Sequence, residues 1–238
     1  MVLKVVVFFV VFRGEFSIFC STKKPISYFT INLMSKLISE GSNFVVIGAW
    51  NPAIIQPAWL KKQFQNLIPD KVIVKGTAGL VSLLNFDLEK IILDPNGGRL
   101  LFIPKIVDEE TLKYITELSN GIYDRLKHTP ISAAGCNFSF ALEENENFSL
   151  DEIDKDDQIV GLYAFLKGNQ LVSKSVRHSF STEDHTININ YDYRGKNKVL
   201  RINYDYQAPL NPMQKAADAL INNFMHAKDL SANLIRSK

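Results

Sequence analysis

The residues best able to act as acids, bases or nucleophiles are scattered along the chain. His178 lies in an apolar stretch between Val176 and Phe180, and His185 directly follows Asp184. An imidazole titrates near neutral pH, so His178, His185 and Asp184 could serve a small hydrolase or nuclease-like enzyme. A lone histidine on an apolar face is more often a packed core residue, and acidic residues are common in turns. These residues therefore define an alternative function without a reaction class.

No motif with a known mechanism accompanies the histidines. The sequence contains no G-x-S-x-G, P-loop or H-E-x-x-H pattern and no G-x-G-x-x-G after a strand. Cys20 and Cys136 belong to no C-x-x-C pair and to no Cys/His cluster with zinc spacing. Cys136 lies in the apolar stretch "ISAAGCNFSFAL", where a small buried side chain is the ordinary interpretation. We therefore expect no metal, no cofactor and a protein that is not an enzyme.

A nearly repeated segment, "ININYDYRGKNKVLRINYDYQ" at 187–207, predicts a β-hairpin. Side chains alternate along a strand, so isoleucine and tyrosine share one face in each copy. A loop centred on Lys196-Asn197 brings the two apolar faces together and predicts Tyr191 opposite Ile202 and Asp192 opposite Arg201. With "TEDH" as the preceding loop, Val176 faces Tyr191 and Phe180 faces Ile187.

The same register tests whether the repeated Asn-Tyr-Asp units bind a metal. Asp205 would lie opposite Asn188, four residues along the strand from Asp192. At ~3.4 Å per residue the two carboxylates would be roughly 13 Å apart, so they cannot share an ion.

The opposite face of the predicted strands is polar. Two predicted rows on this face hold Arg177, Asn190, Asn203 and Ser175, Asp192, Arg201. Short, stiff hydrogen-bonding side chains could bind a polar partner with little loss of side-chain entropy. Antiparallel sheets commonly leave one face in water, so a solvated face is the more usual interpretation and a binding face the alternative.

The charge balance gives little support to nucleic-acid binding. Lys and Arg total 27 against 25 acidic residues, which leaves a net charge of +2. So small an excess does not argue for tracking along phosphates, although Arg177, Arg194 and Arg201 would be the residues of a weak nucleic-acid binder. The acidic run from Glu143 to Asp157 is typical of a solvated loop.

The first 33 residues differ from the rest of the chain. "MVLKVVVFFVVF" has an apolar run of eight residues after Lys4, less than half of the ~20 that a transmembrane helix needs. It lacks the features of a signal peptide, and Met34 opens a more natural start. We expect residues 1–33 to be an extension or a misassigned start, dispensable for folding, with an added edge strand as the alternative. The protein is then expected to be cytoplasmic, with no transmembrane segment.

Groups of predicted strands alternate with predicted helices along the chain. Strands are predicted at 43–50, 71–76, 80–93 and 99–105. In the last of these, Leu100–Ile103 is apolar at odd and even positions alike, which indicates a strand in the centre of the sheet. A helix begins at Pro57, a second is capped by Asp108, and a third is capped by Asn211 and runs over 212–235. Further strands are predicted at 131–142, 161–168 and 170–181.

This order predicts an α+β protein with a largely antiparallel sheet and about three main α-helices. We expect a single domain over residues 34–238, with halves 34–128 and 129–238 each closed by a helix. In topology alone, strand-rich units closed by helices resemble the SecB type of chaperone. We expect a non-enzymatic protein-binding or assembly module that contacts a protein partner or a second copy through its sheet and helices.

Overall fold

The computed structural model describes residues 8–12, 15–19, 36–76, 84–143, 146–148, 173–194, 196–208 and 211–237. The chain divides into two compact units, Met1–Met34 and Ser35–Lys238. In the first unit, β1 (Phe8–Phe12) and β2 (Glu15–Phe19) pair antiparallel as a two-stranded sheet of their own. That residues 1–33 are dispensable stays a prediction.

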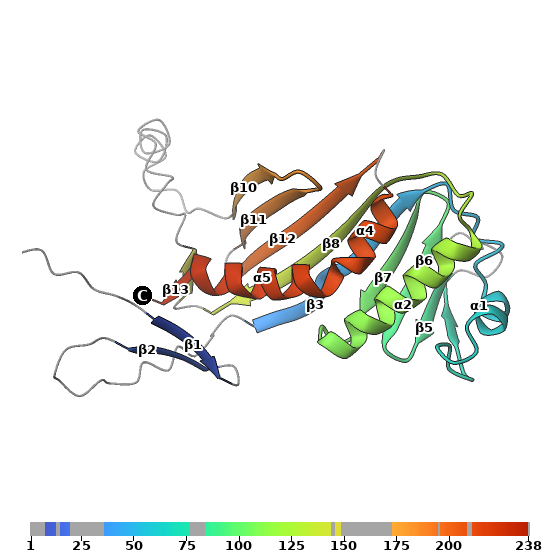
Figure 1. Cartoon of the computed structure of the whole chain (residues 1–238), viewed down its shortest axis with the longest axis horizontal. Helices are drawn as coiled ribbons and strands as arrows, with labels where there is room; N and C mark the ends of the chain where they lie inside the picture. Colours follow the sequence, from blue (N-terminus) through green and yellow to red (C-terminus); the bar gives the residue numbers. More distant parts are fainter. Residues whose placement is uncertain are drawn as a thin grey trace, which may run out of the picture. The chain divides into compact units, whose positions relative to one another are not determined.

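Nine strands of the second unit form one antiparallel main sheet, in the order β10-β11-β12-β8-β3-β7-β6-β5-β4 (Figure 1). A short β9 (Glu146–Phe148) pairs separately with β13 (Ile235–Ser237). The strands of the main sheet are β3 (Lys36–Gly48), β4 (Ile73–Lys75), β5 (Asn85–Leu88), β6 (Ile91–Asn96), β7 (Arg99–Pro104), β8 (Ile131–Leu142), β10 (Ser173–Ser181), β11 (Thr186–Arg194) and β12 (Asn197–Gln207).

The two halves of the main sheet repeat one arrangement. In the first half, β5, β6 and β7 form a meander whose last strand pairs with β3; in the second half, β10, β11 and β12 form a meander whose last strand pairs with β8. β3 and β8 pair antiparallel where the halves meet. Helices follow each meander, so the predicted α+β class and the order of strands, helix, strands and helix are confirmed.

The described chain has four helices: α1 (Pro57–Gln63), α2 (Glu109–Arg125), α4 (Pro212–Asp218) and α5 (Leu220–Leu234). The predicted caps are present: Asp108 accepts a hydrogen bond from the Thr111 amide at 2.8 Å, and Asn211 accepts one from the Gln214 amide at 3.5 Å. The single last helix that we predicted is interrupted at Ala219, which ends α4 and precedes α5.

Helices α2, α4 and α5 lie across one face of the main sheet (Figure 1). Between the helices and this face lies one hydrophobic core, which includes the fully buried Phe44, Leu100, Phe102, Ile202 and Tyr204. Burial of a large aliphatic or aromatic side chain stabilises the fold by roughly 1.5–3 kcal/mol. We call the face of the main sheet opposite these helices the open face.

The hairpin prediction gave the correct buried face of each strand but the wrong residue pairs between the strands. Ile189 pairs with Ile202 and Tyr191 with Leu200, a shift of two residues from the predicted pairs Tyr191 with Ile202 and Asp192 with Arg201. Arg194 pairs with Asn197, so only Gly195 and Lys196 lie between the strands, and a two-residue hairpin loop favours Gly at its first position. The upstream pairs Val176 with Tyr191 and Phe180 with Ile187 are confirmed.

Where the structure describes the strand predicted over 80–93, from residue 84 on, the chain forms a hairpin instead. Leu88 pairs with Ile91, and the turn at Glu89 and Lys90 separates β5 from β6. Glu89 has φ 62°, in the left-handed region that favours glycine. The run Leu100–Ile103 lies in β7, inside the main sheet as predicted. The strand predicted at 161–168 and most of the acidic run lie outside the described residues.

Candidate functional site

The six residues predicted as a polar binding face do lie on the open face, but in different rows. Arg177, Asn190 and Arg201 are directly paired across β10, β11 and β12, whereas Asn203 pairs with Asn188. The two predicted rows were wrong because they used the shifted hairpin register. The corrected register also places Asp205 opposite Thr186, six residues from Asp192, so the two carboxylates lie ~20 Å apart along the strand and cannot share an ion.

The six side chains mostly bind one another or Asn188. Ser175 donates a hydrogen bond to Asp192 at 2.7 Å, and Arg201 forms an ion pair with the same carboxylate. Arg177 donates to the Asn188 amide oxygen at 2.9 Å. Asn190 makes no side-chain hydrogen bond to any described residue. Most of the polar face is therefore satisfied within the protein.

An asparagine ladder, Asn188, Asn203, Asn137 and Asn43, crosses four strands on this face. Asn188 donates to Asn203 at 2.8 Å, Asn203 to Asn137 at 2.9 Å, and Asn137 to Asn43 at 2.8 Å. Each amide sits directly opposite the next in the strand pairing. Because Asn137 of β8 bonds to Asn43 of β3, the ladder ties the two halves of the sheet together. Its hydrogen bonds all run in one direction and therefore polarise one another.

The other half of the open face is apolar, which the sequence analysis did not predict. An apolar patch is formed by aliphatic side chains of β3, β6 and β7: Val45, Ile47, Ile92, Leu101 and Ile103. Val45 pairs with Leu101, and Ile92 with Ile103. Ile47 is 41% exposed and the other four are half-buried. None of the five belongs to the core or to the residues packed against it.

Charged pairs of both signs border the apolar patch. Asp94 forms an ion pair with Arg99 at 3.2 Å. Asp87 forms ion pairs with Lys105 and, at 3.4 Å, with Lys75. The hydrogen bond from Lys105 is the largest influence that lowers the pKa of Asp87, so this carboxylate is ionised at neutral pH. The patch thus has a charged rim of mixed sign.

The apolar run Leu100–Ile103 could have predicted this patch from the sequence. A strand that is apolar on both parities presents one apolar row to the core and a second row to the opposite face. The second row, Leu101 and Ile103, was interpreted only as a sign of a central strand. The described helices pack on the other face of the sheet, so this second row is left partly exposed.

The residues of the alternative enzyme do not assemble into a catalytic group. His178 pairs with Ile189, four residues from His185 along the neighbouring strand, a separation of ~14 Å. Asp184 forms an ion pair with Lys215 at 2.6 Å. His185 Nδ1 lies 3.2 Å from Thr182 Oγ1.

His185 belongs to an aromatic cluster at the end of the hairpin. Its ring stacks on Tyr206 at 4.9 Å between centroids. Tyr204 Oη lies 3.0 Å from His226 Nδ1, and Asn223 donates to Tyr206 Oη at 2.9 Å. Burial lowers the pKa of His185, against the attraction of Asp184. The cluster holds the first half of α5 to the sheet, and the lowered pKa leaves His185 neutral at pH 7.

Cys136 lies under this cluster and is completely buried, as its apolar surroundings in the sequence predicted. Burial raises the pKa of its thiol to about 12. Since the thiolate is the nucleophilic form, Cys136 is chemically inert in the folded protein.

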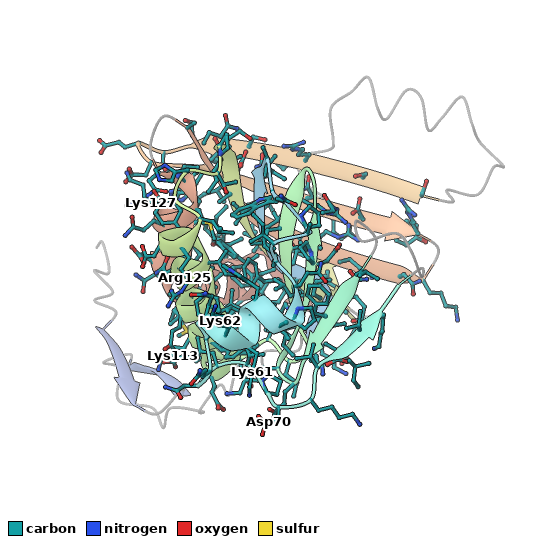
Figure 2. All side chains as sticks on the ribbon, turned by 90° about the vertical axis from the view of Figure 1, so that its right-hand side faces the viewer. Lys61, Lys62, Asp70, Lys113, Arg125 and Lys127 are labelled. Atoms are coloured by element: carbon teal, nitrogen blue, oxygen red, sulfur yellow. The ribbon has the colours of Figure 1, made fainter. Side chains whose placement is uncertain are left out.

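Several basic residues lie on α1, on α2 or just after α2. In Figure 2, Lys61, Lys62, Lys113, Arg125 and Lys127 are spread over the side of the molecule that carries α1 and α2. Lys61 forms an ion pair with Asp70 at 2.6 Å, and Lys113 forms one with Glu109 at 2.7 Å. The Arg125 guanidinium lies 4.4 Å from the centre of the Phe64 ring. Because Lys61, Lys113 and Arg125 bind groups of their own chain, these residues give little support to a phosphate-binding surface.

A cavity of about 320 Å³ lies beside α2 and the turn at Glu89. Lys90 at its edge forms an ion pair with Glu110 at 2.6 Å. Tyr114, also in the lining, donates a hydrogen bond to the Leu67 carbonyl at 3.0 Å, and burial raises the pKa of Tyr114 to about 12. Lys90 and Tyr114 are therefore engaged with groups of the chain itself.

Within the described residues, no His, Cys, Asp and Glu side chains gather as a metal-binding group of three or more. None of the helices that the structure describes is long and apolar enough to cross a membrane. No protein-family model matches the chain, and a search of curated proteins finds no similar sequence.

Proposed function

We propose that this protein is a protein-binding or assembly module that uses the open face of its main sheet. The observation that supports the proposal best is the apolar patch of Val45, Ile47, Ile92, Leu101 and Ile103 on a face that no described helix covers. Contiguous apolar surface outside the core is typical of sites where another protein docks.

The arrangement of the open face fits the usual anatomy of a protein interface. Such interfaces have an apolar centre and a polar, solvent-accessible rim. Here the apolar patch would be the centre. The polar face of Ser175, Arg177, Asn190, Asp192, Arg201 and Asn203 would be the margin, where Asn190 has hydrogen-bonding groups to offer a partner.

The side chains with chemical reactivity favour binding over catalysis. Asp184 is paired with Lys215, and Cys136 is inert through burial. Secreted domains of modest size commonly carry a disulfide framework, and the chain has only two cysteines, far apart. We therefore propose that the protein works in the cytoplasm.

The test is capture of binding proteins from a native extract with the tagged full chain. We expect Leu101→Lys combined with Ile103→Lys to abolish capture, because two ammonium groups would have to be desolvated at the centre of the interface. Arg177→Ala combined with Asn190→Ala should weaken capture and leave the unfolding temperature unchanged.

Thr186→Lys is the matched control, since it adds a lysine to the same face, opposite Asp205 and outside the apolar patch. The control should capture the same proteins as the wild type. If both double variants capture the full wild-type set, the open face is not the binding surface and the proposal is wrong.

A further inference from the structure

The apolar patch also indicates which partner it fits. We infer that the patch docks against the same patch of a second copy of this chain, in a two-fold symmetric dimer in which two main sheets pack face to face. This inference rests on the proposed function and names the partner of the same surface. Sheets that pack face to face interdigitate aliphatic side chains across ~10 Å.

The shape and composition of the patch suit another sheet. Its five side chains come from three neighbouring strands and are all aliphatic. Gly135 and Ala133 of β8 lie opposite Val45 and Ile47 in the strand pairing. These two small residues extend the patch onto β8 without adding a polar group.

The charged rim favours a second copy over a partner of one charge sign. A two-fold axis brings each rim group opposite the rim of an identical surface. The rim of one copy holds the carboxylates of Asp87 and Asp94 and the cations of Lys75, Arg99 and Lys105. A rim of mixed sign is complementary to itself, whereas it would attract a strongly acidic or strongly basic partner only weakly.

The asparagine ladder limits how the two copies can be arranged. Its amides are already bonded to one another and stand beside the patch, where Val45 Cγ1 and Asn203 Nδ2 both lie near Gly135. Covering the ladder would bring polar groups out of water without new partners. A two-fold axis roughly parallel to the strands covers only the apolar halves. It leaves both polar halves in solvent, where they stay available to another protein.

The area of the apolar patch allows a weak dimer of this kind. Four neighbouring strands, β8, β3, β7 and β6, carry the patch, and at ~4.8 Å spacing and ~20 Å length they cover roughly 400 Å² of sheet plane. Two copies would then bury roughly 800 Å² or more, because accessible surface exceeds the flat area. That value lies at the upper limit of chance contacts and in the range of weak, transient interfaces, so we expect a dimer that dissociates on dilution.

Sedimentation velocity of the purified full chain over a wide concentration series tests the inference. We expect the wild type to sediment as a dimer at high concentration and to dissociate on dilution. Leu101→Lys combined with Ile103→Lys should weaken self-association by at least about 100-fold. Thr186→Lys should leave it unchanged, because that residue lies on the solvated half.

Two further results make the test decisive. If the lysine variant unfolds, the milder pair Ile47→Ser and Ile103→Ser replaces it and should raise the dissociation constant by about 10-fold or more. A wild type that stays monomeric at the highest concentration, or a lysine variant that dimerises like the wild type, overturns the dimer. If the monomeric wild type still captures other proteins through Leu101 and Ile103, only the dimer is wrong and the proposed function stands.

Discussion

Leu100 and Leu101 are adjacent leucines of β7 that face opposite sides of the main sheet, so one pair of substitutions tests the two-faced architecture. Leu100 is 0% exposed and belongs to the core. Leu100→Ala should lower the free energy of unfolding by about 2–5 kcal/mol, through lost burial and the cavity left behind. Leu101 is half-buried and is neither a core residue nor one of the residues packed against the core. In the monomer, Leu101→Ala should cost less than about 1 kcal/mol.

Urea unfolding of both variants, followed by circular dichroism at several protein concentrations, measures these differences. At low concentration the two variants should differ by at least about 1 kcal/mol. At high concentration Leu101→Ala should lose additional stability relative to the wild type, because a dimer stabilises only the folded chain that forms it. Equal costs for the two variants at the lowest concentration would mean that Leu101 is buried within the monomer and would refute the open face.

Four other predictions follow from particular residues. Asn203→Ala should lower the free energy of unfolding by about 1–3 kcal/mol in urea titrations, since it removes one hydrogen bond from each of the two neighbouring amides, Asn188 and Asn137; a change below ~0.5 kcal/mol would mean that water replaces the ladder. The pKa of His185 is lowered by burial, so the unfolded chain binds the proton first and stability falls as the pH drops below ~6.5; His185→Gln should make the unfolding temperature less dependent on pH between 7 and 5, and an unchanged slope would contradict this assignment. Glu89→Gly should raise the free energy of unfolding by about 0.5–1 kcal/mol, because glycine adopts a φ of 62° without strain; destabilisation instead would show that the Glu89 side chain makes a stabilising contact. A chain that begins at Met34 should keep the unfolding temperature of the full chain in calorimetry, because all the core residues that the structure describes lie beyond that point; a large drop would assign the first segment to the core.

The sequence predicted those features that depend on a short stretch of the chain. The alternation of isoleucine and tyrosine in 187–207 determined which face of the hairpin is buried, because a strand has a period of two and the core accepts only one face. The caps at Asp108 and Asn211 were predictable because each satisfies a free amide of the first helical turn. Both features follow from local chemistry.

Features that depend on the tertiary arrangement could not be predicted in the same way. The hairpin register depends on which two residues form the turn, and shifting the turn by one residue moves every pair by two while keeping the parity. The asparagine ladder joins Asn43 and Asn137 to Asn203, positions that become neighbours only because β3 and β8 pair at the centre of the sheet. Whether Leu101 and Ile103 face a helix or solvent depends on all the helices packing on one side.

The central claim is that the apolar half of the open face contacts another protein molecule, and site-specific photo-crosslinking tests it most directly. A photoreactive phenylalanine analogue would replace Ile103 in the full chain, and in a matched control it would replace the exposed Asp124 of α2. Both variants are irradiated at the concentration where the wild type self-associates. We predict that position 103 crosslinks to a second copy of the chain or to a captured protein, and that position 124 crosslinks to neither. No crosslink from position 103, or equal yields from both positions, would contradict the account.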